Sequence, residues 1–337
     1  MGLKKSIARP RFVVYLVILV VLLILPRLIS TFNLILFEYG LTFAIVGLGF
    51  NLLLGYTGLL SFGHGAYFAA GAYGVAMTAK YFPQLYSMEI LIPAALLISF
   101  IISVIFGFVC VRHTRIFFAI LALALSMLFY ALVFKFYHIT GGSDGLYVKV
   151  PSVFSITFEG VRRPRFLSGF YYYFLLGAFI ASFIIMKGIV SSPFGRALQA
   201  IRDNELRAEL IGIRVRRYRL YAFVISGMFT GLAGALWSFI NGHVTPDVSH
   251  WVFSGEIVYM TLIGGFAIFE GPLIGAMIFT FLKLYAMGTT EYWMFIIGAT
   301  LIILVLLLPK GIAGGFKSLA DRIKGRRLLV GVQNASR

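Results

Sequence analysis

Ten apolar runs, each close to the length that a lipid bilayer demands, constrain this chain more than any other feature of its sequence. A transmembrane helix needs about 20 consecutive apolar residues. Of the 337 residues, 60% are hydrophobic and 12% are charged, whereas soluble domains have about 25% charged residues. The runs cover approximately residues 12–31, 35–54, 62–82, 90–111, 116–136, 170–187, 218–240, 252–269, 271–288 and 292–309. We therefore predict an all-α integral membrane protein, a polytopic bundle of 8–10 transmembrane helices. The third and eighth runs are glycine-dense or short, as expected of broken or re-entrant segments.

The positive charge of the chain is unevenly distributed. A net charge of +17 would suggest a nucleic-acid partner for a soluble protein, but membrane proteins gather Lys and Arg on their cytoplasmic side. The N-terminus, the turn at 112–115, the segment 187–219 and the tail from Lys310 carry four, two, eight and seven of these residues. All four regions lie on one side of a ten-span arrangement, so we predict cytoplasmic termini and no nucleic-acid partner. Residues 1–309 then form a single transmembrane domain, and residues 310–337 form a basic cytoplasmic tail against anionic membrane lipid.

The segment 187–219, here called the surface segment, is the only long internal stretch dense in charge. Ser192 and Pro193 suit a helix start and Gly212 a helix stop, which predicts one amphipathic helix of about five turns. Its apolar side would contain Phe194, Leu198, Ile201 and Ala208, and its polar side Arg196, Asp203, Arg207 and Arg214. Such a helix is too polar to cross a bilayer. It must lie on the membrane surface or in a groove of another protein.

Glycines and polar side chains gather from Gly47 to Gly74, inside apolar sequence. At membrane depth, glycines let helices approach closely or break a helix so that its backbone lines a cavity. The polar residues favour a break near Gly55–Gly65, which protein must cover or water must reach. The candidate translocation residues here are Asn51, Gly55, Tyr56, Thr57, Gly58, Ser61, Gly63 and His64. A second glycine-rich zone, at 261–276, adds Gly264 and Gly265.

Isolated ionisable residues in the apolar runs leave alternatives open. His64 is either a substrate or gating group, or a neutral imidazole that is hydrogen-bonded within the bundle. We expect Lys283 to extend along its span toward the membrane interface, and Glu256 to lie near a span end. Gly227 and Gly231 have a GxxxG spacing, which indicates helix packing within the chain.

Several motifs are missing from the sequence. There is no GxxxxGK[ST] phosphate-binding loop, so the chain does not hydrolyse ATP through a loop of this kind. There is also no HExxH motif of the kind that would suggest a membrane metalloprotease. The single cysteine, Cys110, excludes an internal disulfide and a cysteine-based metal site.

Three blocks of sequence together resemble the LivM-type permeases of branched-chain amino acid ABC importers. The first is GFNLLLGYTGLLSFGHGAYFAAGAY, the second SPFGRALQAIRDNELRAELIG with YRLYAFVISGMFTGLAGAL, and the third SGEIVYMTLIGGFAIFEGPLIGA. The resemblance implies an ATP-driven importer in a prokaryotic inner membrane. It further implies a second, LivH-type permease, two cytoplasmic ATPase subunits that hold ATP and magnesium, and an extracytoplasmic substrate-binding protein.

By the same resemblance, residues 189–217 correspond to a cytoplasmic coupling region that seats in a cleft of one ATPase. The candidate contacts are Arg196, Arg202, Asp203, Glu205, Arg207, Ala208, Glu209 and Gly212. Related permeases carry urea, amides or other small organic solutes, so the substrate class stays open between these and branched-chain amino acids. An ion-coupled secondary carrier is a second hypothesis, because two glycine-broken regions also occur in such carriers.

Overall fold

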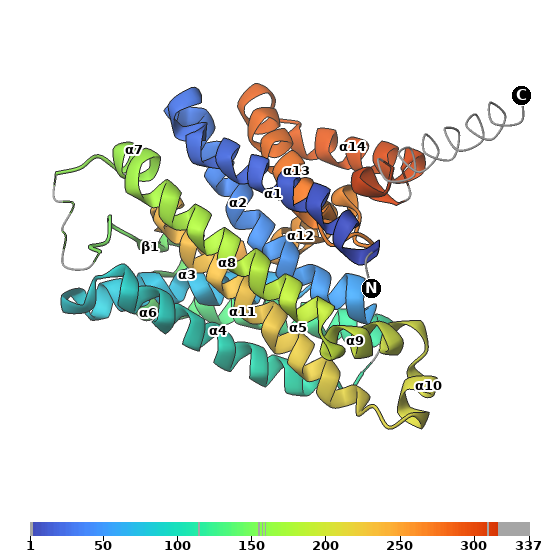
Figure 1. The fold of residues 1–337 in the computed structure, drawn as a ribbon. Coiled ribbons are helices and arrows are strands. Elements are labelled where there is room, and N and C mark those ends of the chain that lie inside the picture. Colours follow the sequence, from blue (N-terminus) through green and yellow to red (C-terminus); the bar gives the residue numbers. More distant parts are fainter. Residues whose placement is uncertain are drawn as a thin grey trace, which may run out of the picture.

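The chain folds as a bundle of long helices (Figure 1), seen in a computed structural model that describes residues 3–113, 115–153, 156, 158, 160–308 and 310–315. Ten long helices match the ten apolar runs in order. They are α1 (Leu3–Leu28), α2 (Thr31–Asn51), α3 (His64–Tyr81), α4 (Met88–Cys110), α5 (Arg115–Lys135), α8 (Tyr172–Ser191), α11 (Val215–Asn241), α12 (Trp251–Gly264), α13 (Gly271–Thr289) and α14 (Trp293–Leu307). Most of the predicted basic tail, residues 316–337, lies outside the described residues.

Short elements connect the long helices. The helical ones are α6 (Tyr137–Thr140), α7 (Arg163–Phe166), α9 (Pro193–Asp203), α10 (Glu205–Leu210), the π-helical turns η1 (Leu52–Thr57) and η4 (Leu167–Tyr171), and the 3₁₀ turns η2 (Pro83–Leu85), η3 (Gly142–Asp144) and η5 (Pro246–Ser249). Two strands, β1 (Leu146–Tyr147) and β2 (His243–Val244), pair antiparallel.

Six helical stretches of the described residues are long and apolar enough to cross a membrane. They are Thr31–Thr57, Met88–Cys110, Ile116–Lys135, Arg163–Ser191, Val215–Asn241 and Gly271–Thr289. Three shorter apolar helices, Tyr15–Leu28, Trp251–Gly264 and Trp293–Leu304, match further predicted runs. The all-α polytopic fold class is confirmed. The helix of the eighth run ends early, at Gly264, whereas the third run forms α3 over nearly its full length.

The centre of the bundle consists of α2, α3 and α11, with α4 packed against α3 and α11. In α11, 72% of the most apolar window is buried, whereas in α4 and α5 it is 28%. α4 and α5 therefore lie at the periphery, where exposed side chains such as Leu97, Ile105 and Phe108 suit a lipid surround. α3 is buried continuously from His64 to Ala76, as expected of an apolar helix that protein surrounds on all sides.

Glycines set the distance between α3 and α11. A Cβ on Gly71 would collide with the carbonyl of Gly231, and one on Gly234 with the carbonyl of Phe68. Gly227 and Gly231 of α11 also face Ser103 and Ser99 of α4. The GxxxG pair thus packs within the chain, as predicted.

The two ends of the bundle differ. Figure 1 shows β1, α6 and α7 at one end, and α9, α10, the start of α1 and the end of α14 toward the other. At the β1 end, the hydroxyl of Tyr86 donates to the carbonyl of Lys149 (2.6 Å) and Arg163 donates to the carbonyl of Val148. The first bond ties the connection between α5 and α8 to the turn between α3 and α4, and the second lies within that connection.

Replacing Gly71 with alanine is expected to destabilise the protein, because the new Cβ would push α3 away from α11 along their whole contact. Overpacking of this kind costs about 1–3 kcal/mol. The measurement is thermal unfolding of the detergent-purified protein. Gly188→Ala in α8 is the matched control, since no atom lies within 4 Å of the added Cβ. Equal melting temperatures for the two variants would contradict the close approach of α3 and α11.

Candidate functional site

α2 does not end as a regular helix. It passes into the π-helical turn η1 and stops at Gly58, whose φ of 72° is left-handed. Glycine adopts this conformation without strain. Apart from a bend at Phe62, residues 58–63 form no regular structure before α3 begins at His64. The helix break that we predicted near Gly55–Gly65 is therefore present.

The surface segment covers this break. The guanidinium of Arg202 in α9 donates to the carbonyl of Gly55. A Cβ on Gly58 would stand 2.9 Å from Cγ of Arg202, so the arginine stem lies directly on the break. A backbone carbonyl freed from a helix in apolar surroundings needs a donor. Arg202, which we predicted to contact an ATPase, supplies that donor within the chain.

His64 lies in a closed polar network. Its Nδ1 is 3.2 Å from the Ser61 hydroxyl and its Nε2 is 2.8 Å from the Ser226 hydroxyl of α11. The rings of Phe50 and Tyr67 stand edge-on to the imidazole, which is fully buried. This geometry matches the second of the two interpretations, an imidazole hydrogen-bonded within the bundle.

The second glycine-rich zone is also broken, between α12 and α13. Gly265, with a φ of 98°, begins a non-helical connection that ends at Gly271. A Cβ on Gly55 would stand 2.7 Å from the carbonyl of Phe266. The structure therefore brings the two predicted breaks together, although they are some 200 residues apart in the sequence.

A further contact links this second break to the surface segment. Lys187 lies 3.8 Å from the carboxylate of Glu270 and donates to the hydroxyl of Tyr15 (2.9 Å). That hydroxyl in turn donates to Glu270 (2.8 Å). Both breaks are thus held by basic side chains of the surface segment.

The surface segment is not one helix of five turns. It divides at Asn204, whose backbone is extended and whose side chain accepts from the N–H of Arg207 (3.0 Å). Asn is a strong N-cap and starts a new helix, α10, so the single-helix prediction is wrong. The stop at Gly212 is present with a left-handed φ of 89°. Leu198, Ile201 and Ala208 are buried, as the amphipathic pattern predicted.

The charged residues of the surface segment fall into two groups. Glu205 forms a two-point ion pair with Arg219 of α11 (2.7 and 2.8 Å), and Arg202 contacts Gly55 and Asp203. Arg196, Arg207 and Glu209 are instead exposed. Of the predicted ATPase contacts, Ala208 is 0% exposed and packs inside the chain. Glu205 and Arg202 have partners within the chain, and their contact with an ATPase stays a prediction.

Sequence reasoning missed an apolar surface on α10. Leu206, Leu210 and Ile211 are 67%, 78% and 75% exposed. Their neighbours Arg207 and Glu209 are exposed as well. We call these five residues the α10 tip. Leu206 and Leu210 depart from the amphipathic pattern of the surface segment. That departure was the signal available in the sequence.

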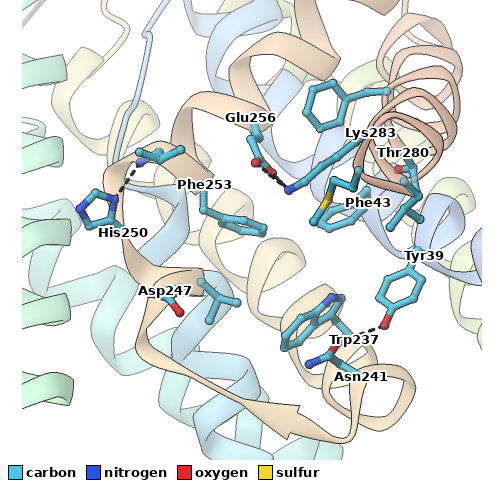
Figure 2. A pocket seen from close by; sticks show the side chains of 15 residues that line it. Tyr39, Phe43, Trp237, Asn241, Asp247, His250, Phe253, Glu256, Thr280 and Lys283 are labelled. Atoms are coloured by element: carbon cyan, nitrogen blue, oxygen red, sulfur yellow. Dashed lines mark hydrogen bonds and ion pairs between the residues drawn. The ribbon is translucent and has the colours of Figure 1, made fainter. Parts of the chain in front are cut away.

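A cavity of about 440 Å³ lies among α2, α11, η5, α12 and α13 (Figure 2). We call it the aromatic pocket. Its lining comprises Tyr39, Phe43, Trp237, Asn241, Asp247, Val248, His250, Val252, Phe253, Glu256, Phe279, Thr280, Lys283, Leu284 and Met287. None of the predicted translocation residues is among them. Gly58 instead lines an apolar groove of about 460 Å³ with Leu60, Phe62 and α5 residues, and the other predicted residues line neither.

An ion pair lies in the wall of the aromatic pocket. The ammonium of Lys283 in α13 donates to both carboxylate oxygens of Glu256 in α12, each at 2.6 Å. Lys283 is thus tied to a neighbouring helix, and its extension toward the interface stays a prediction. The two residues are 27 positions apart on different helices, so no spacing rule could have paired them. Among the described residues, no three His, Cys, Asp or Glu side chains gather as a metal site would require.

Replacing Arg202 with methionine is expected to loosen the break, because the carbonyl of Gly55 loses a charge-assisted donor worth about 1.5–3 kcal/mol. Amide hydrogen exchange over residues 52–62 should become about tenfold faster or more. Arg196→Met is the control, since Arg196 lies on the same helix and is exposed. Equal exchange in both variants would exclude Arg202 as the cover of the break.

Replacing Glu205 with glutamine is expected to release α10, because the guanidinium of Arg219, only 5% exposed, loses its counter-charge. The loss is about 1–3 kcal/mol. Trypsin should cleave after Arg207 and Arg214 several-fold faster. Glu209→Gln makes the same chemical change at an exposed carboxylate and should leave cleavage unchanged; equal cleavage of both variants contradicts the role of the pair.

Known proteins resemble this chain over nearly its whole length. A family model described as "Branched-chain amino acid transport system / permease component" matches residues 33–305. The permease protein LivM of Escherichia coli (strain K12), from a high-affinity branched-chain amino acid transport system, is 25% identical over 338 residues, covering 91% of this chain and 79% of the relative. LivM of Salmonella typhimurium (strain LT2) is 25% identical over 312 residues, covering 88% and 73%.

A LivH permease protein is also similar. LivH of Salmonella typhimurium is 24% identical over 286 residues, which cover 82% of this chain and 92% of the relative. No solved structure matches the chain. The resemblance that the three sequence blocks carry is confirmed. Since the family model spans most of the sequence, the chain belongs to the family of permease components of branched-chain amino acid transport systems.

Proposed function

We propose that this chain is a transmembrane permease subunit of an ATP-driven importer for branched-chain or similar small amino acids. The observation that carries the proposal is the surface segment. Its helix pair, α9 and α10, is too polar for the bilayer and exposes an apolar tip, while Arg202 of α9 and Lys187 at the end of α8 contact the two helix breaks. The names of the LivM and LivH relatives support the substrate class.

The α10 tip fits the groove of a partner protein. Three large apolar side chains exposed together, with an arginine and a glutamate among them, are typical of an apolar contact with a polar rim. The ion pair between Glu205 and Arg219 anchors the tip to α11. A force on the tip therefore reaches α11 through that pair, and the break at Gly55 through Arg202 of the adjoining α9.

Further subunits follow from this assignment. Two cytoplasmic ATPases would hold ATP and magnesium, and this chain would bind neither. A LivH-type permease would complete the translocation pathway, and an extracytoplasmic protein would deliver the solute. The surface segment and both termini would lie in the cytoplasm of an inner-membrane protein, as the distribution of Lys and Arg supports.

Charge introduced at the α10 tip is expected to uncouple the ATPases. In Leu210→Glu, a buried carboxylate at the contact should lower the amount of ATPase that copurifies with the tagged chain about tenfold or more. ATP-dependent uptake of labelled leucine into membrane vesicles should fall in parallel. Lys149→Glu, an exposed charge reversal at the opposite end of the bundle, should leave both quantities unchanged.

The proposal fails on either of two results. One is uptake by the wild-type protein that runs on an ion gradient after ATP is removed, which would favour a secondary carrier. The other is full ATPase recovery and full uptake in Leu210→Glu.

A further inference from the structure

We propose that the aromatic pocket binds a zwitterionic amino acid with an apolar side chain, whose carboxylate pairs with Lys283 and whose ammonium pairs with Glu256. This inference rests on the proposed function, since it names the residues of this chain that would recognise the solute.

The ion pair is the first argument. Ionisable residues inside membrane helices are costly, and those that are kept usually serve a ligand or an ion. The side chains of Lys283 and Glu256 are only 22% and 11% exposed, and their direct pairing at 2.6 Å compensates both charges. Replacing the pair by apolar residues would often cost nothing, so stability alone gives little reason for it.

A zwitterion matches this pair in a way that other solutes do not. If it enters between Lys283 and Glu256, each charge of the protein exchanges its partner for a charge of the solute, and no buried group is left unpaired. A lone carboxylate or a lone amine would leave one side chain unpaired, which is strongly unfavourable at a buried site. A neutral solute would leave the pair closed.

The walls of the pocket are the second argument. Figure 2 shows Phe253, Trp237 and Tyr39 around the space that separates the ion pair from the hydrogen bond between Tyr39 and Asn241 (3.1 Å). A volume of about 440 Å³ lies within the range of about 300–1,000 Å³ that is usual for small-molecule sites. An apolar side chain would lie against the aromatic rings while the charged end meets the pair.

The position of the pair is the third argument. Glu256 is on α12 and Lys283 is on α13, the two helices that the break at Gly265–Gly271 joins. A solute that enters the pair therefore contacts both helices that flank this break. The connection between α12 and α13 lies against the first break, where Phe266 is close to Gly55. A chain of direct contacts therefore links the pocket to the breaks that the surface segment contacts.

The test is binding of labelled L-leucine to the purified full-length chain in nanodiscs of phosphatidylcholine. Lys283→Met and Glu256→Gln should each weaken binding at least tenfold. The double variant Glu256→Lys with Lys283→Glu keeps an ion pair and should recover part of the affinity. Lys149→Met, which removes an exposed lysine far from the pocket, should bind as the wild type does.

Competition on the wild-type protein tests the same point without any variant that could misfold. Leucinol lacks the carboxylate and 4-methylpentanoate lacks the ammonium, so each should displace leucine at least tenfold less well than isoleucine does. Equal displacement by either compound, absence of leucine binding, or unchanged affinity in both single variants would overturn the proposal.

A phospholipid with an ethanolamine headgroup carries the same pair of charges and is the other source of this chemistry. Native mass spectrometry of the chain after exchange into phosphatidylethanolamine shows whether such a lipid stays bound. A lipid that remains and that leucine cannot displace overturns the amino-acid assignment. ATP-driven uptake by the assembled complex separates the two proposals. If uptake persists in both single variants, the amino-acid site is rejected and the importer function stands. If the wild-type chain binds leucine but the complex shows no ATP-driven uptake, the importer function is rejected and the site stands.

Discussion

Backbone that leaves a helix inside an apolar bundle must find a partner within the protein, and this constraint organises the whole chain. α2 breaks at Gly58 and the α12–α13 connection breaks at Gly265. Each break is held by a basic side chain of the surface segment, Arg202 for the first and Lys187 for the second. The surface segment is therefore part of the packing of the membrane region. This is the physical basis for transmitting a movement at the surface to the centre of the bundle.

The long helices could be predicted from the sequence because hydropathy and length act locally, and all ten runs became helices. The break at Gly58 was predictable for the same reason, since glycines and polar residues cluster there. The division at Asn204 was missed because the apolar pattern continues through it to Ala208, while a single capping side chain decides the end of α9.

The residues that depend on tertiary contact could not be predicted. Nothing local distinguishes Glu205, which pairs with Arg219, from Glu209, which is exposed. The same holds for Lys283, whose partner lies on another helix. The glycine-rich stretch drew attention to His64, yet the cavity with a charged wall lies elsewhere. It lies between helices whose ionisable residues, Glu256 and Lys283, looked isolated in the sequence. Position in the fold, more than residue type, separates packing roles from contacts with ligands or partners.

The central claim, that the α10 tip is where the transport machinery meets its energy source, is tested most directly by photocrosslinking in native membranes. A photoreactive amino acid at Leu210 reports contacts of the tip, and one at Tyr147, which is 79% exposed at the opposite end, serves as the reference. The account predicts an adduct with the ATPase subunit at Leu210 and none at Tyr147. ATPase adducts that are absent at Leu210, or that form equally at both positions, would contradict it.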